Sequence, residues 1–207
     1  MMLTAFTAAL LLTTVSEIGD KTFFIAAILA MRHSRRVVFA GASAALAVMT
    51  VLSVGMGQVA SLLPKHYVAW AEILLFLGFG LKLLYDASQM SPKDTPMDEC
   101  KQTEAEINQL EAKSKRRTQW AVLAQAFGMT FLAEWGDRTQ FTTIALAAAN
   151  NPVGVTLGAI LGHAFCAAIA VQCGRYVCGK LSERTLTSIG GALFLLFAGV
   201  GLVELIR

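Results

Sequence analysis

The sequence predicts an all-α polytopic membrane protein whose six transmembrane helices form two inverted three-helix repeats. Three observations predict this fold: an apolar composition, six long apolar segments, and one motif that occurs twice. Hydrophobic residues make up 56% of the chain and charged residues 15%, whereas a soluble domain is roughly 45–50% apolar and about 25% charged. A membrane helix needs about 20 mainly apolar residues, and each of the six segments is long enough.

The first repeat, residues 1–88, contains three of these segments. They are Thr4–Met31, Val37–Leu63 and Val68–Ala87. The N-terminus lacks the basic residues of a signal peptide, and its apolar run continues without a break. We therefore interpret it as the start of the first membrane helix. The second segment is rich in Ala, Gly and Ser, which allow membrane helices to approach closely.

A polar connector, residues 89–118, separates the two repeats. Ser91–Arg117 holds six Lys or Arg residues and six Asp or Glu residues. Glu104–Lys113 has mild helical character, with Ile107 and Leu110 on one side. We expect a solvated, partly helical linker here rather than a binding module.

The second repeat, residues 119–207, contains the segments Trp120–Ala149, Val153–Val177 and Leu186–Ile206. It matches the first repeat over nearly its whole length. The alignment pairs Glu17 with Glu134, Gly41 with Gly158, Gly57 with Gly174 and, after a four-residue gap, Gly80 with Gly201. Because each repeat has three spans, the second enters the membrane from the opposite side, as in many secondary transporters.

The distribution of basic residues predicts the orientation in the membrane. The turns after the first and fifth segments and the connector are basic, whereas the other two turns carry only Lys65. Cytoplasmic loops are enriched in Lys and Arg, so both termini are expected outside the cytoplasm. We expect an integral protein of a bacterial inner membrane.

The motif E-x-G-D-[KR]-T occurs at residues 17–22 and again at 134–139, a spacing of 117 residues. Both copies lie inside apolar segments, where ionisable groups are costly and commonly functional. On a continuous helix, Glu and Asp three residues apart share a face. The motif acids are Glu17, Asp20, Glu134 and Asp137. Inverted symmetry is expected to bring them together as an oxygen-rich site suited to Mg, Ca or Mn.

Other motif residues are expected to support this metal site. Neutral oxygen ligands are expected from Thr22, Thr139 and Gln140. Gly19 and Gly136 are expected to break their helices and so to free backbone carbonyls as further ligands. Lys21 and Arg138 each lie four residues after a motif Glu, the favourable order for a helical ion pair. Pairing within each half is the structural alternative, but four acids and two bases leave a charge that a divalent cation would balance.

Other candidate sites are weaker. The cysteines, Cys100, Cys166, Cys173 and Cys178, form no C-x-x-C pair, and Cys166 and Cys173 are interpreted as small packing residues. His163 and Cys166 lie three residues apart and suggest a soft-metal face, but a packed helix surface is the preferred interpretation. The net charge of +3 does not indicate nucleic-acid binding.

The doubled motif, on the first and fourth of six predicted spans, resembles that of the E-x-G-D-[KR]-[TS] cation exchanger family. This family includes MneA-type manganese exporters and Golgi manganese/calcium–proton exchangers, and the resemblance covers the whole chain. It implies Mn²⁺ export from the cytoplasm, with Ca²⁺ as another possible substrate, in exchange for protons. The family's acidic residues correspond to Glu17, Asp20, Glu134 and Asp137.

The predicted function is secondary export of Mn²⁺ by cation/proton antiport, without an enzymatic reaction or a cofactor. Glu17 and Glu134 are expected to carry protons, while Lys21 and Arg138 orient or balance the carboxylates. A Ca²⁺/H⁺ antiporter is the alternative within transport, and Met56 and Met129 do not decide between the metals. An intramembrane metal-dependent hydrolase or a metal sensor are alternatives from other classes. The expected partners are a divalent ion and the bilayer, and the oligomeric state is left open.

Overall fold

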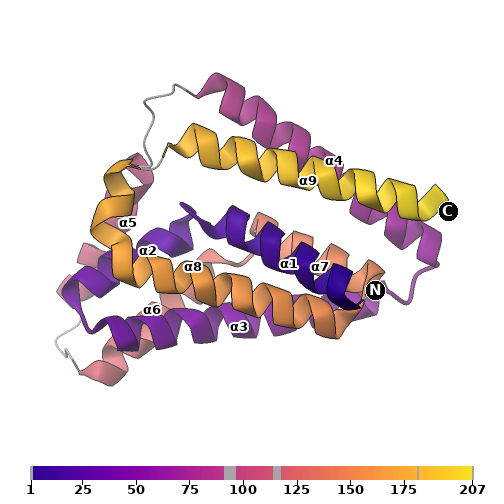
Figure 1. Cartoon of the computed structure of the whole chain (residues 1–207). Helices are drawn as coiled ribbons and strands as arrows, with labels where there is room; N and C mark the ends of the chain where they lie inside the picture. The colour runs from indigo at the N-terminus through magenta and orange to yellow at the C-terminus, as the bar shows by residue number, and fades with distance from the viewer. Residues whose placement is uncertain (1, 91–96, 114–117, 181, 207) are drawn as a thin grey trace.

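The computed structural model describes residues 2–90, 97–113, 118–180 and 182–206, and every regular element in these ranges is a helix. The helices are α1 (Met2–Glu17), α2 (Lys21–Arg32), α3 (Arg35–Ala60), α4 (Lys65–Gln89), α5 (Met97–Lys113), α6 (Gln119–Ala133), α7 (Arg138–Ala149), α8 (Pro152–Lys180) and α9 (Glu183–Ile206). They pack into an elongated bundle with both termini at one end and α5 at the other (Figure 1). An all-helical membrane protein is therefore confirmed.

Four helices are long and apolar enough to cross a membrane: α3, α4, α8 over Pro152–Cys173, and α9 over Arg184–Ile206. The pair α1 and α2 also qualifies when it is taken as one span, although its two helices are bent by 64°. By length and composition alone, the described residues thus offer four or five candidate spans, fewer than the six predicted.

The first and fourth predicted segments are not continuous helices, which corrects the sequence-based expectation. The first divides into α1 and α2, with a break after Glu17. The fourth divides into α6 and α7, with a break after Ala133. As a consequence, Glu17 and Asp20 do not share a helical face, and neither do Glu134 and Asp137.

The short helices α2 and α7 lie inside the bundle. Helix α2 contacts α3, α5, α6 and α8, and its side chains Phe24, Ala27 and Leu29 are fully buried. Helix α7 contacts α1, α3, α4 and α8, and its Thr and Gln side chains near the break are buried. Broken backbone at membrane depth is tolerated only where protein or a cavity surrounds it, and this arrangement meets that condition.

The contacts of one half recur in the other. Helix α8 packs on α1 and α2, as α3 packs on α6 and α7. A Cβ atom at Gly41 would lie 2.7 Å from the Leu123 carbonyl oxygen of α6. A Cβ atom at Gly158 would collide with the Phe6 carbonyl oxygen of α1. The two glycines that the sequence alignment pairs thus permit the same close helix contact in each half.

The connector contains a docked helix rather than a solvated linker. Helix α5 packs against α2, with Ile107 and Thr103 buried, whereas Leu110 is exposed. Arg32, at the end of α2, donates hydrogen bonds to Glu104 (2.9 Å), Asn108 (2.6 Å) and Glu111 (3.1 Å). Spacings of four and three residues place these three partners on one face of α5. The expectation of a solvated, partly helical linker included the helix but missed this face, because its partner is distant in sequence.

Glu111 joins α5 to the α2–α3 turn. Its Oε1 lies 3.0 Å from His33 Nε2, while its Oε2 accepts from Arg32. Burial alone would raise the pKa of the Glu111 carboxyl, but the hydrogen bonds from His33 and Arg32 hold it below its usual value. Ion pairs as well as the burial of Ile107 therefore stabilise the packing of helix α5 on the bundle.

Candidate metal centre

Each copy of the motif ends a helix at its glutamate and turns the chain at its glycine. Glu17 is the last residue of α1, and Glu134 caps the C-terminus of α6. Gly19 has a φ of 86° and Gly136 a φ of 84°. Helices commonly end in a residue of this left-handed conformation, which glycine adopts without steric cost. Both glycines therefore lie in the breaks between helices, where the sequence analysis expects them.

The aspartate of each motif starts the next helix. Asp20 is the N-cap of α2 and Asp137 the N-cap of α7, where its Oδ2 accepts from the Thr139 N–H (3.2 Å). Asp is favoured at this position because its carboxylate satisfies free N–H groups and interacts well with the helix dipole. The motif therefore encodes a helix end, a left-handed turn and a helix start, with a carboxylate on each side of the break.

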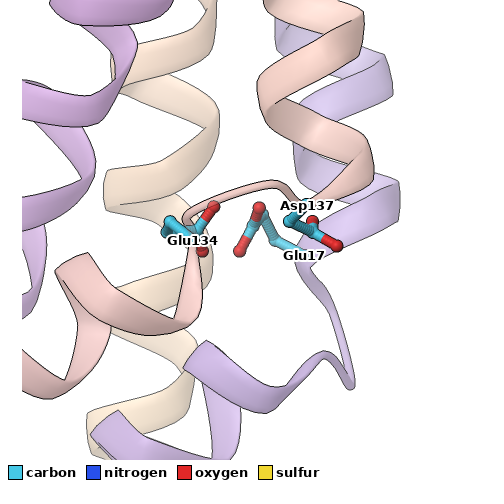
Figure 2. A group of neighbouring side chains, drawn as sticks. All are labelled: Glu17, Glu134 and Asp137. Carbon is cyan, nitrogen blue, oxygen red and sulfur yellow. The ribbon is translucent and has the colours of Figure 1, made fainter.

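Three of the four motif acids converge from the two breaks. One carboxylate oxygen from each of Glu17, Glu134 and Asp137 lies within 4.8 Å of the others, and Figure 2 shows the three side chains close together. Glu17 and Glu134 are each only 2% exposed. Metal–oxygen distances are about 2.0–2.6 Å, so one ion can bind oxygens with this separation.

In each glutamate, one carboxylate oxygen accepts a hydrogen bond and the other has no hydrogen-bond partner. The Thr22 hydroxyl donates to Glu17 Oε2 (3.0 Å), and the Thr139 hydroxyl donates to Glu134 Oε2 (3.1 Å). The Oε1 atoms of both glutamates are buried without a hydrogen-bond partner. Buried polar atoms are rarely left unsatisfied, and two unpartnered carboxylate oxygens in one cluster are what a cation would stabilise.

Asp20 lies outside the group of three. Its Oδ1 is 3.7 Å from Arg138 Nη2, so the basic residue of the second motif contacts the acid of the first. Both side chains line a cavity of about 80 Å³, together with residues of α1, α4 and α9. Asp20 and Arg138, one from each motif, thus line the same cavity.

The helical ion pairs of Lys21 and Arg138 that the structural alternative required are absent from the described contacts. Lys21 Nζ instead bonds Glu106 Oε1 of α5 at 2.9 Å, and Arg138 contacts Asp20. The cause is the helix break, since four-residue spacing brings side chains together only on a continuous helix. The two halves therefore do not neutralise themselves as the structural alternative required.

Thr22, Thr139 and Gln140, expected to offer neutral oxygens, make hydrogen bonds to the acids and to the turn. Both threonine hydroxyls donate to the glutamate of their own motif. Gln140 Oε1 accepts from the Gly136 N–H at 2.7 Å, so that oxygen stabilises the second break. The corresponding residue of the first half is Phe23, which makes this bond a feature of one half.

His163, on α8, was not singled out by the preferred interpretation of the sequence. Its side chain is buried, and its Nδ1 lies 3.6 Å from Glu17 Oε1. Cys166, one turn further, is buried and its Sγ–H donates to the Thr14 carbonyl (3.3 Å). A polar, ionisable side chain within an apolar span is itself a signal of function, and His163 carried that signal.

A family of known transporters matches this chain. The family model described as "Divalent cation/proton antiporter GDT1" matches residues 5–91 and 122–207, which include both motifs. The chain belongs to the GDT1 family. Members of the GDT1 family are antiporters, so the protein is a transporter of divalent cations and not an enzyme. The hydrolase alternative is thereby set aside, and no cofactor is indicated.

Relatives in the GDT1 family match nearly the whole chain. A GDT1-like protein of Synechocystis sp. is 56% identical over 200 residues, covering 96% of this chain and 97% of that protein. GDT1-like protein 3 of Oryza sativa subsp. indica is 45% identical over 197 residues, covering 92% and 71%. The chloroplastic PAM71-homolog of Arabidopsis thaliana is 41% identical over 206 residues, covering 93% and 57%. No solved structure matches the chain.

Replacing Gly136 by Ala is expected to lower both stability and transport. A left-handed conformation costs a non-glycine residue about 1–2 kcal/mol, and relief of that strain would move Glu134 relative to Asp137. A Cβ atom at Gly136 has nothing within 4 Å, so backbone strain rather than a clash is tested. Gly128→Ala is the matched control, because Gly128 is helical and equally unobstructed. Thermal unfolding and ion flux that are equal in the two variants would contradict the role of the turn.

Proposed function

We propose that this protein exports Mn²⁺ from the cytoplasm in exchange for protons. The observation that carries the proposal is the pair of unpartnered Oε1 atoms of Glu17 and Glu134, which lie with Asp137 in one cluster. Carboxylate oxygens suit Mg, Ca and Mn. Glu17, Glu134 and Asp137 are the proposed ligands, and Asp20 the acid through which the ion enters or leaves.

The alternative substrate is Ca²⁺, which also binds carboxylate oxygens. The two ions differ in size and in their tolerance of nitrogen ligands. Uptake into proteoliposomes should be compared for Mn²⁺, Ca²⁺ and Mg²⁺, each with and without a pH gradient. Preferred uptake of Ca²⁺ over Mn²⁺ would replace the proposed substrate, while no uptake of any divalent ion would overturn the transport site.

The proposed membrane arrangement has six passages as two inverted repeats, residues 1–88 and 119–207. Helix pairs α1–α2 and α6–α7 each form one broken passage, and α3, α4, α8 and α9 form the other four. Support comes from the matching helix contacts of the two halves and from both termini lying at the bundle end opposite α5 (Figure 1). Such broken helices, meeting at the interface of inverted repeats, are a recurring plan for midplane ion sites.

The end of the bundle that carries α5 is proposed to face the cytoplasm of a bacterium, with both termini outside the inner membrane. Arg32, Arg35 and Arg36 lie in or next to the turn between α2 and α3 at that end. The positive-inside rule assigns such basic turns to the cytoplasm.

A single cysteine on α5 tests this orientation. Cys100 is a natural reporter but is only partly exposed, so Gln102→Cys in a variant lacking the native cysteines is the better site. We expect a membrane-impermeant thiol reagent to leave it unlabelled in intact cells and to label it after lysis. Labelling in intact cells would reverse the assigned orientation and with it the direction of transport.

Proton coupling supplies the work of export. Moving a divalent ion out against a negative-inside potential costs about 2.3 kcal/mol per charge per 100 mV. Buried carboxylates favour the protonated form when no cation is bound and the ionised form when one is. Metal and protons therefore compete for the same oxygens, and Glu17 and Glu134 are the proposed proton carriers. Two or more protons per ion make the exchange at least electroneutral.

A Mn²⁺ pulse is expected to change the internal pH of proteoliposomes, with protons moving opposite to the metal. An imposed pH gradient should drive Mn²⁺ uptake, and an uncoupler that collapses the gradient should stop it. Vesicles that contain the Glu134→Gln variant provide the control for leakage. Metal flux without proton movement, and without response to a pH gradient, would exclude this mechanism and point to another coupling ion.

A further inference from the structure

We propose that His163 supplies a nitrogen ligand to the transported ion and thereby selects Mn²⁺ over Ca²⁺. The inference rests on the proposed function and adds a ligand that lies outside both motifs. His163 belongs to α8, which packs along α1 and α2 beside the first break. Its side chain is 4% exposed, so it is buried among the helices that build the site.

Two unpartnered atoms face each other at this point. His163 Nδ1 and Glu17 Oε1 are both buried without a hydrogen-bond partner, although they lie only 3.6 Å apart. Ligands bind metals at about 2.0–2.6 Å, so two ligands of one ion lie at most about 4–5 Å apart. A cation shared by Nδ1 and Oε1 would satisfy both atoms at nearly their present separation.

The two other polar groups that line the small cavity beside Glu17 are already engaged. The Thr22 hydroxyl donates to Glu17 Oε2, and the Cys166 Sγ–H donates to a backbone carbonyl. This cavity is otherwise lined mainly by apolar side chains, among them Phe23 and Leu46. Among these neighbours, His163 is therefore the group with an unused donor atom for a metal.

The histidine is present in one half alone. In the alignment that pairs Glu17 with Glu134, His163 of α8 corresponds to Leu46 of α3. The first half thus adds no second nitrogen. His163 lies outside the group of three carboxylates, so its imidazole would bind the ion on the Glu17 side of that group. Ca²⁺ binds oxygen ligands, whereas imidazole suits transition metals. One nitrogen among oxygens therefore favours Mn²⁺ over Ca²⁺ without removing the preference for hard ligands.

Pulsed electron paramagnetic resonance of Mn²⁺ bound to the purified full-length chain tests the ligand directly. We expect a ¹⁴N coupling that changes when histidine is labelled with ¹⁵N, that disappears in His163→Asn, and that persists in His66→Asn. His66 is the matched control, because it lies at the far side of the bundle next to the α3–α4 turn. Asn suits this test because its amide oxygen can take the place of Nδ1, so an oxygen ligand replaces the nitrogen ligand.

Transport selectivity provides the second measurement. His163→Asn is expected to raise the KM for Mn²⁺ by roughly 10-fold or more and to change the KM for Ca²⁺ much less, since loss of even an outer partner of a metal ligand costs about 10–100-fold in metal affinity. A residue that only packed or only oriented Glu17 would shift both ions together.

The outcomes separate this inference from the function it rests on. A wild-type protein that exports Mn²⁺ but shows no nitrogen coupling overturns the inference and leaves the proposed function standing. A wild-type protein that moves Ca²⁺ but neither binds nor moves Mn²⁺ overturns both. If His163→Asn does not fold, the ¹⁵N-dependent coupling of the wild type still decides the question.

Discussion

Replacing Glu134 by Gln is expected to lower Mn²⁺ uptake into proteoliposomes by at least about 10- to 100-fold, because loss of even an outer partner of a metal ligand costs that much in affinity. Glu134 is 2% exposed and its Oε1 has no hydrogen-bond partner, so the substitution removes a charge and a ligand at nearly constant volume. It also relieves repulsion among buried carboxylates. Thermal stability should therefore hold or rise while transport is lost.

The same loss is expected for Glu17→Gln and Asp137→Asn, and a smaller one for Asp20→Asn. Asp20 contacts Arg138 and stands outside the three converged carboxylates. Glu204→Gln is the control, since this exposed glutamate of α9 lines a separate cavity near the bundle end that carries the termini. Initial rates of Mn²⁺ uptake, normalised to folded protein, give the comparison. Wild-type uptake rates in all four motif variants would contradict the proposal that these acids form one shared metal site.

The helical membrane class could be predicted from the sequence because apolar length alone determines it, but the broken helices could not be predicted from apolarity. Thr4–Met31 and Trp120–Ala149 are mainly apolar and carry no charged residue outside the motif, and hydrophobicity does not distinguish one helix from two. The signal for the break lay in the motif itself. A glycine followed by Asp combines a helix-ending residue with an N-cap residue, and this combination occurs once in each half.

The partners of the charged motif residues depend on tertiary structure. Lys21 and Arg138 occupy equivalent positions in the two motifs, yet one contacts Glu106 of the connector and the other contacts Asp20. Local spacing predicts the same partner for both, and only the fold makes them different. The convergence of Glu17 with Glu134 and Asp137 could be predicted from the sequence repeat, because inverted symmetry relates their positions. Their role as ligands stays a prediction.

The docking of helix α5 also could not be predicted from the sequence. Its sequence indicates some helix and one apolar side, but its docking depends on Arg32 at the far end of α2. The family match also omits residues 92–121, which include α5. The ion pairs that Lys21 and Arg32 of α2 make with α5 join this connector to the helix that Asp20 caps. The connector thus belongs to the structural surroundings of the first motif.

Replacing Gly158 by Leu is expected to prevent stable packing of α8 on α1. Even a Cβ atom at this position would collide with the Phe6 carbonyl oxygen and lie 3.1 Å from the Ala9 Cβ. Backbone atoms of a neighbouring helix cannot rotate away, so the two helices must separate. Overpacking typically costs about 1–3 kcal/mol. We expect Gly158→Ala to lower the unfolding temperature and Gly158→Leu to leave little monodisperse protein in detergent.

Gly55 provides the control for this last prediction. It lies within α3, and a Cβ atom there has nothing within 4 Å. Gly55→Ala is expected to be neutral or stabilising, because Ala is favoured over Gly in a helix by roughly 1 kcal/mol. Gly41→Ala should behave like Gly158→Ala, since it meets α6 as Gly158 meets α1. Equal unfolding temperatures for the Gly55 and Gly158 variants, measured by thermal unfolding in detergent, would contradict the close helix contact. The packing of α8 on α1 also holds His163 beside Glu17, so a separation of these helices should abolish metal binding together with stability.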